Sequence, residues 1–148
     1  MLATVGRREE ARTHLATSLA SARRISCEPE VQALSQPTFV HIVDGDWGAA
    51  LATLRDSAIP LHRGHDLADA AMALDAAAAI ALHADRSDLA QHATAAASRT
   101  RDRLGVAPWP TWSELVDTTH ANSPTPEVQA VRETDPFTVL DGVLAEVR

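Results

Sequence analysis

The sequence predicts an all-α protein built from antiparallel helix pairs. Alanine accounts for 29 of the 148 residues and aromatic residues for only 3%. Alanine is the strongest helix former and buries little area, which favours close helix-on-helix packing. Valine, isoleucine and threonine form no alternating runs of the kind that half-buried strands need. The third indication is an internal repeat, because a period of about 40 residues is typical of stacked helix pairs.

The repeat becomes visible when Gly6, Gly45 and Asp85 are aligned, since these anchors are almost evenly spaced along the chain. Each anchor is followed five residues later by an alanine and nine residues later by leucine or threonine. The alanines are Ala11, Ala50 and Ala90, and the later positions are Leu15, Leu54 and Thr94. We therefore expect related helical segments throughout residues 1–105.

The first elements are less regular than the later ones. Residues 1–5 are expected to end a first helix whose beginning is missing, so that the chain is a fragment of, or a remnant related to, a longer array. Residues 28–43 should be helical by analogy, although Pro37 falls inside this range. We favour a shorter helix capped by Ser35, with Pro37 in its first turn, over one kinked helix.

Asp46 predicts the start of the next helix, because a carboxylate can cap the free amides of a first turn. Pro60 predicts a kink or an early end, and Gly64 a stop. The expected apolar face consists of Trp47, Leu51, Leu54, Ala58 and Leu61.

A further helix is expected over residues 66–83, with Asp66 and Asp69 in a capping arrangement. Its apolar face would be Leu67, Ala71, Leu74, Ala78 and Leu82. After a turn over residues 84–87, another helix should run to Leu104 and stop at Gly105. Its last turns hold Arg99, Arg101 and Arg103, and positive charge is favourable at a helix C-terminus.

The character of the chain changes after Gly105. Residues 106–148 hold seven acidic residues and two arginines, which is −5 of the net charge of −7. We divide the chain into helical repeats over residues 1–105 and an acidic, proline-containing capping segment over residues 106–148. This segment is expected to contain a short helix over residues 111–120 and a terminal amphipathic helix over residues 136–147. The apolar face of the terminal helix would comprise Phe137, Leu140, Val143 (or Leu144) and Val147.

The aligned alanines and leucines resemble those of tetratricopeptide-like (TPR-like) helical repeats. Ala11 with Leu15, and Ala50 with Leu54, match the small and larger apolar positions of that family's second helix, whereas Thr94 departs from the pattern. The run DLAQHATAAASRTRDRLGVAPW is similar to the alanine-rich C-terminal repeats of actinobacterial LuxR-type ATPase regulators and cyclases. The resemblance implies a right-handed superhelix that binds another protein or peptide, in signalling or transcriptional regulation. No P-loop glycine motif and no helix-turn-helix accompanies it.

Composition excludes several classes of protein. The net charge of −7 argues against direct binding of nucleic acid, which needs a basic face. The single cysteine, Cys27, excludes an internal disulfide and any CxxC motif. No run of apolar residues is long enough for a membrane span, and the N-terminus lacks the apolar core of a signal peptide. The sequence therefore predicts a cytoplasmic protein without a membrane partner.

Two groups of residues are candidates for binding. His62 and His65 lie in the run HRGHD, where two histidines and an acid could form a metal site. Because they flank Gly64 at an expected turn, we interpret them instead as an exposed helix end. Trp109 and Trp112 are either anchors for a partner or a cap over the open end of the stack, and we favour the cap.

The sequence thus favours a protein-protein interaction scaffold with no catalytic residues, no cofactor and no metal. The alternative is a small all-α metal- or ligand-binding enzyme that uses the His and Asp residues. A homo-oligomer, in which a second copy replaces the missing first helix, is a third hypothesis.

Overall fold

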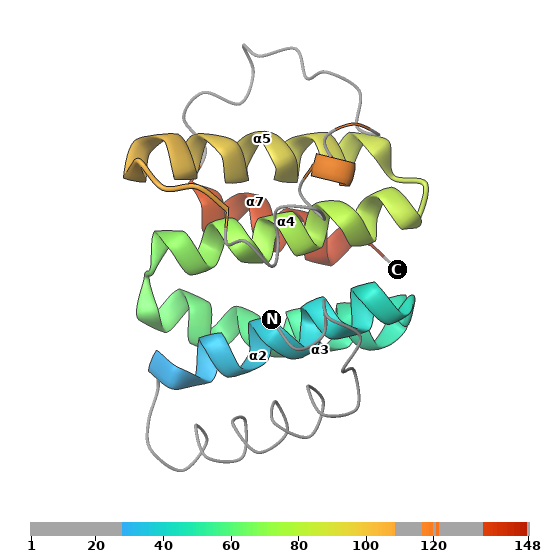
Figure 1. Ribbon diagram of the computed structural model, residues 1–148, viewed down its shortest axis with the longest axis horizontal. Coiled ribbons are helices and arrows are strands. Elements are labelled where there is room, and N and C mark those ends of the chain that lie inside the picture. The colour runs from blue at the N-terminus through green and yellow to red at the C-terminus, as the bar shows by residue number, and fades with distance from the viewer. Residues whose placement is uncertain (1–27, 109–116, 120, 122–134, 148) are drawn as a thin grey trace. The chain divides into compact units, whose positions relative to one another are not determined.

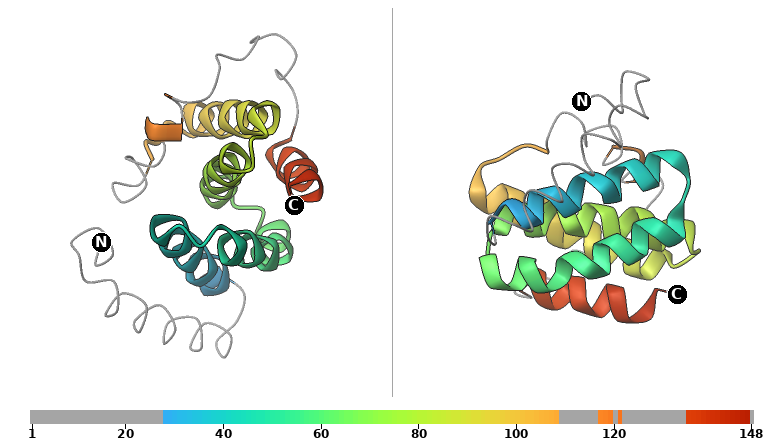
Figure 2. Two further views of the ribbon diagram at one scale, coloured as in Figure 1. Left: turned by 90° about the vertical axis from the view of Figure 1, so that its right-hand side faces the viewer. Right: turned by 90° about the horizontal axis from the view of Figure 1, so that it is seen from below.

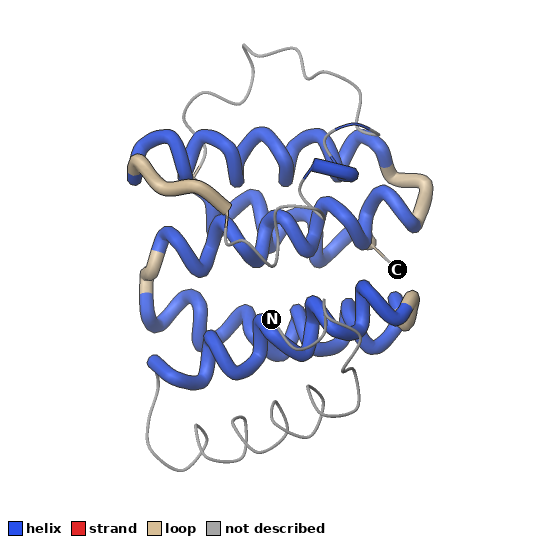
Figure 3. The backbone as a smooth tube through the Cα atoms, in the orientation of Figure 1, coloured by secondary structure: helices blue, strands red, loops and turns tan. Residues whose placement is uncertain are grey.

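The computed structural model describes residues 28–108, 117–119, 121 and 135–147, and in these ranges it contains helices and no strand (Figure 1, Figure 3). The all-α prediction is confirmed for this part of the chain. The helices with defined bounds are α2 (Glu28–Asp44), α3 (Trp47–Gly64), α4 (Leu67–His83), α5 (Ser87–Leu104) and α7 (Pro136–Glu146). The chain divides into two compact units, Met1–His65 and Asp66–Arg148, which we describe separately. Neither unit contains a described helix that combines the length and the apolar character required to span a membrane.

The described part of the first unit is a hairpin of α2 and α3. As predicted, Asp46 caps α3, and its Oδ1 accepts a hydrogen bond of 3.1 Å from the amide of Ala49. The two helices bury mainly apolar residues, together with the polar residues Thr38 and Ser57. The buried apolar residues are Phe39, Val40, Ile42, Ala50, Leu51, Leu54 and Leu61.

Pro37 and Pro60 both lie inside helices, and the helix α3 ends at Gly64 as predicted. α2 is one helix with Pro37 inside it, so the shorter helix capped by Ser35 is wrong. α3 likewise continues through Pro60 to Gly64, so an early end at Pro60 is wrong. A proline inside a helix removes one backbone hydrogen bond and crowds the preceding turn. Packing outweighs this cost here, because Thr38, Phe39 and Val40, which follow Pro37 directly, are buried.

In the second unit, α4 packs against both α5 and α7 (Figure 2). Every residue of α4 from Ala70 to Ala81 is buried. The predicted apolar face is therefore confirmed at Ala71, Leu74 and Ala78, but the residues between them are buried as well, and Leu67 is 38% exposed. A helix that is apolar on all sides is buried on all sides, whereas an amphipathic helix buries one stripe.

The two hairpins have the same backbone turns, and these turns occur at positions that the sequence repeat makes equivalent. Gly45 and Asp85 both have positive φ angles, of 76° and 57°, and so do His65 and Gly105, at 50° and 66°. In both hairpins the same turn hydrogen bond forms, from Asp46 to His41 at 2.8 Å and from Arg86 to Ala81 at 2.9 Å. α3 and α5 are each 18 residues long. These equivalences support the alignment of Gly45 with Asp85.

The terminal helix α7 has the bounds and the face that the sequence predicts, to within one residue. Asp135 caps it, with Oδ2 accepting from the amide of Thr138 at 3.0 Å, and Pro136 occupies the first turn. The predicted apolar face is buried, and it includes Phe137, Leu140, Val143, Leu144 and Val147.

We predict that Ala50 tolerates no larger side chain. Ala50 of α3 is fully buried, so Ala50→Leu should lower the free energy of unfolding by about 1–3 kcal/mol through overpacking. Urea denaturation measures the change. The matched control is Ala52→Leu, because Ala52 is exposed on the same helix and its replacement should change stability by less than about 0.5 kcal/mol. Equal stability of the two variants would contradict the packing described.

Candidate functional site

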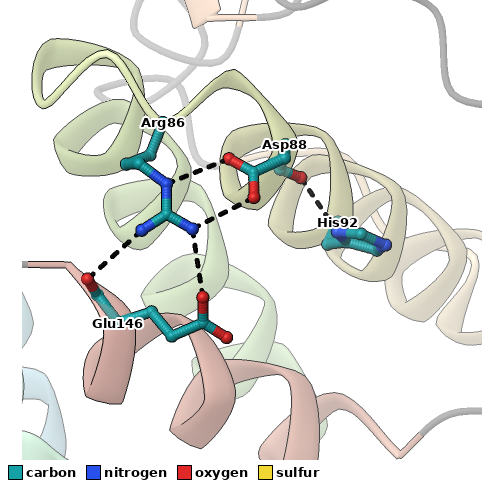
Figure 4. Close-up of polar contacts among 4 residues, drawn as sticks. All are labelled: Arg86, Asp88, His92 and Glu146. Atoms are coloured by element: carbon teal, nitrogen blue, oxygen red, sulfur yellow. Dashed lines mark hydrogen bonds and ion pairs between the residues drawn. The ribbon is translucent and has the colours of Figure 1, made fainter.

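Arg86 lies at the turn between α4 and α5, where it replaces a helix cap. The sequence repeat makes Arg86 the equivalent of Asp46, which caps α3. Arg86 occupies the N-cap position of α5, but no side-chain hydrogen bond caps that helix. Its guanidinium instead extends toward α7, so the second hairpin gives up a cap and gains a connection (Figure 4).

The guanidinium of Arg86 bonds to two helices at once. Nε and Nη2 donate to the two carboxylate oxygens of Asp88, in the first turn of α5, at 3.2 and 3.1 Å. Nη2 also donates to Oε2 of Glu146 at 3.0 Å, and Nη1 donates to the Glu146 carbonyl at 3.4 Å (Figure 4). Arginine suits this place because its planar fork matches a carboxylate and its charge is favourable at the C-terminus of α7.

The cluster around Arg86 is open to solvent. The side chains of Arg86 and Glu146 are 36% and 59% exposed, so their attraction is largely screened by water. The hydrogen bonds from Arg86 lower the pKa of Asp88 below its ordinary value. A shallow pocket beside the ion pairs is lined by Ala84, Arg86, Ala145 and Glu146. The site is therefore suited to holding the end of α7 at the surface.

A buried ion pair joins the two helices of the second hairpin. Arg101 of α5 donates to the carboxylate of Asp75 in α4, and their side chains are only 8% and 4% exposed. Burial raises the pKa of the Asp75 carboxyl to about 6, although the hydrogen bond from Arg101 acts in the opposite direction. Sequence reasoning placed Arg101 at a helix end and missed this pair. The repeat contained the signal, because Arg101 is equivalent to the buried Leu61.

We predict that removing one partner of the Asp75–Arg101 pair strongly lowers the free energy of unfolding, whereas replacing both partners changes it little. Asp75→Ala or Arg101→Leu alone would leave one buried polar group without its partner, and each should cost about 3–5 kcal/mol of unfolding free energy. The double variant introduces at position 101 the leucine that the first hairpin has at Leu61. It should be within about 1 kcal/mol of the wild type, or more stable. Urea denaturation of all four proteins measures the coupling, and additive losses would contradict this prediction.

His62 and His65 lie in the last turn and at the C-cap of α3, as the sequence predicts. His62 is partly buried, and His65 is exposed with a left-handed backbone. The acidic residue of the HRGHD run, Asp66, belongs to the second unit, where it caps α4 by accepting from the amides of Ala68 and Asp69 at 2.8 and 3.1 Å. Within the described ranges, no three His, Cys, Asp or Glu side chains gather closely enough to hold a metal ion.

Several candidates lie outside the described residues. Trp109, Trp112, Cys27 and most of the predicted helix over residues 111–120 belong to this group. The role of Trp109 and Trp112 as a cap or as partner anchors stays a prediction.

Asp69, a partly exposed carboxyl in the first turn of α4, has a pKa well above the ordinary value of an aspartate. Burial, followed by the nearby Asp66 carboxylate, raises the pKa of Asp69 from 3.8 to about 6. The folded protein therefore binds a proton at Asp69 between about pH 4 and 6, whereas the unfolded chain does not.

We predict that this difference destabilises the fold as the pH rises from about 4 to above 6. Asp69→Asn removes one of the two carboxyls whose pKa is raised to about 6, the other being Asp75, and should make this part of the pH dependence less steep. Thermal or urea unfolding across this range, in both proteins, measures the slope. Identical slopes for the two proteins would mean that Asp69 is not protonated in the folded state at pH 5.

No protein-family model, curated protein or solved structure matches the chain. The resemblance to TPR-like repeats thus stays a prediction from the sequence.

Proposed function

We propose that this chain is a protein-protein interaction scaffold that binds another protein or peptide through its helical hairpins. The observation that carries the proposal is the recurrence of one hairpin turn in successive repeats, with positive φ at Gly45 and again at Asp85. Repeated helix pairs present extended surfaces made by several elements, and such surfaces commonly bind proteins. The net charge of −7 favours a protein partner over nucleic acid.

The right-handed TPR-like superhelix and a role in signalling or transcriptional regulation belong to the same proposal. They rest on the likeness of the alanine-rich run in α5 to the repeats of LuxR-type regulators and cyclases. A cytoplasmic location and the absence of catalytic chemistry are part of it as well.

The binding surface is better assigned to second helices than to first helices. α4 is the first helix of its pair, and it is buried from Ala70 to Ala81. The outer face of α3 is open instead. It presents Ile59, which is 65% exposed, with Arg55 and Arg63 four residues before and after it. An apolar residue between two cations suits a partner with an apolar pocket and acidic groups around it.

The test is affinity capture on the immobilised full chain, followed by mass spectrometry and by calorimetry with the purified partner. Ile59→Asp should weaken binding of the partner at least about tenfold, since it places a charge at the centre of the contact. The matched control is Leu104→Asp, which introduces the same charge at an exposed leucine of α5. If no protein distinguishes the two variants, the outer face of α3 is not the binding surface.

A further inference from the structure

α7 carries everything that it needs to begin as a helix. The carboxylate of Asp135 accepts from both the amide and the hydroxyl of Thr138, at 3.0 and 3.1 Å, and Pro136 fixes the first turn. The hairpin of α4 and α5 supplies none of these groups. The N-terminal end of α7 is therefore a self-contained unit that does not depend on its docking site.

The outward side of α7 is poorly suited to a stable helix. The helix has 11 residues, fewer than the roughly 12–15 that an isolated helix needs. Thr138 and Gly142 are exposed and are weak helix formers. A Cβ atom at Gly142 would meet nothing within 4 Å, so alanine would fit there and favour the helix about two- to fivefold. The sequence of α7 therefore gives this helix a lower intrinsic stability than its docking site would allow.

The inward side of α7 is, by contrast, a complete recognition pattern. Counted from Phe137, buried apolar residues stand at positions 1, 4, 7, 8 and 11, and they are Phe137, Leu140, Val143, Leu144 and Val147. Position 10 is Glu146, which Arg86 binds through both its carboxylate and its carbonyl. Apolar anchors at this spacing are typical of an amphipathic helix that docks on a hydrophobic surface.

We infer that α7 is a displaceable intramolecular ligand, and that the face of α4 and α5 which it covers binds a helix of a different protein. The partner helix has apolar residues at the five positions given above, an acidic residue at position 10 that pairs with Arg86, and better helix formers than Thr138 and Gly142 on its outer side. This inference rests on the proposed function and adds a second surface, with a defined class of partner, to the outer face of α3.

Competition sets the affinity that such a partner requires. A ligand tethered in the same chain competes at an effective concentration on the order of millimolar. A partner helix at micromolar concentration must therefore bind about a thousandfold more tightly than α7 to displace it. A change that weakens the docking of α7 lowers the affinity that the partner needs by the same factor. A change that strengthens the docking of α7 raises the affinity that the partner needs.

The experiment measures fluorescence anisotropy of a labelled peptide that has the sequence of residues 135–147 with Gly142→Ala. It is titrated with three full-length proteins. Leu140→Ala removes a fully buried anchor of the intramolecular helix and should bind the peptide at least about tenfold more tightly than the wild type. Gly142→Ala in the protein strengthens its own α7 and should bind the peptide about two- to fivefold more weakly than the wild type.

The charge requirement is tested by a double-mutant cycle. In the Leu140→Ala protein, Arg86→Gln should weaken peptide binding, and so should Glu146→Gln in the peptide. Because both changes remove the same ion pair, the two losses should not add. Additive losses would overturn the assignment of Arg86 as the receptor of the acidic residue.

Four outcomes would overturn the inference. One is a folded Leu140→Ala protein that binds no peptide, and another is equal binding by all three proteins. If Leu140→Ala does not fold, hydrogen exchange of the α7 amides is measured instead. These amides should exchange more slowly in Gly142→Ala and faster in Arg86→Gln, and unchanged rates are the third such outcome. The fourth is a wild-type mass that doubles with concentration, with the doubling lost in Leu140→Ala, since the occupant is then a second copy's α7. None of these results bears on partner capture through Ile59, so the two proposals fail independently.

Discussion

The close approach of helices to α4 is the constraint on which the second unit depends. Eight of the twelve residues from Ala70 to Ala81 are alanines, and all twelve are buried. Small side chains let helix axes come near one another, so that backbone and Cβ atoms make the contacts that larger side chains make elsewhere. Because the alanine side chains are all alike, such an interface does little to favour one alignment of the helices over an alignment shifted along their axes. Other interactions in this unit favour a single alignment.

The polar pair Asp75–Arg101 is the clearest of these features. A buried ion pair adds little net stability, because desolvation offsets the attraction between the charges. It does, however, penalise every register in which the two groups fail to meet. Between two helices rich in alanine, this penalty selects one alignment of α4 and α5. The first hairpin obtains the same selectivity from shape, since its helices interlock through larger residues such as Phe39, Leu54 and Leu61.

Arg86 shows how a repeat acquires a new role by substitution at one position. In the first hairpin the equivalent Asp46 serves its own helix as a cap. In the second hairpin, Arg86 at the equivalent position is positively charged. Its side chain donates instead to the carboxylate and the carbonyl of Glu146, at the end of α7. The hairpin turn is preserved, because it depends on backbone hydrogen bonds and positive φ, and the side chain becomes available for a contact between elements. Both departures from the repeat, at Arg86 and Arg101, thus coincide with interactions specific to the second unit.

The all-α class, the starts of α3, α4 and α7 and the end of α5 could all be predicted from the sequence, because they follow from local features such as caps, glycines and the spacing of apolar residues. The buried face of α7 could be predicted as well, since an amphipathic helix has only one side to bury. The continuation of α2 and α3 through Pro37 and Pro60 could not, because it depends on packing energy that outweighs a lost backbone hydrogen bond. The burial of α4 on all sides and the contact between Arg86 and Glu146, which are distant from each other in the sequence, are likewise results of the tertiary structure. Contacts between distant residues depend on how helices pack in space, and no local pattern encodes that arrangement.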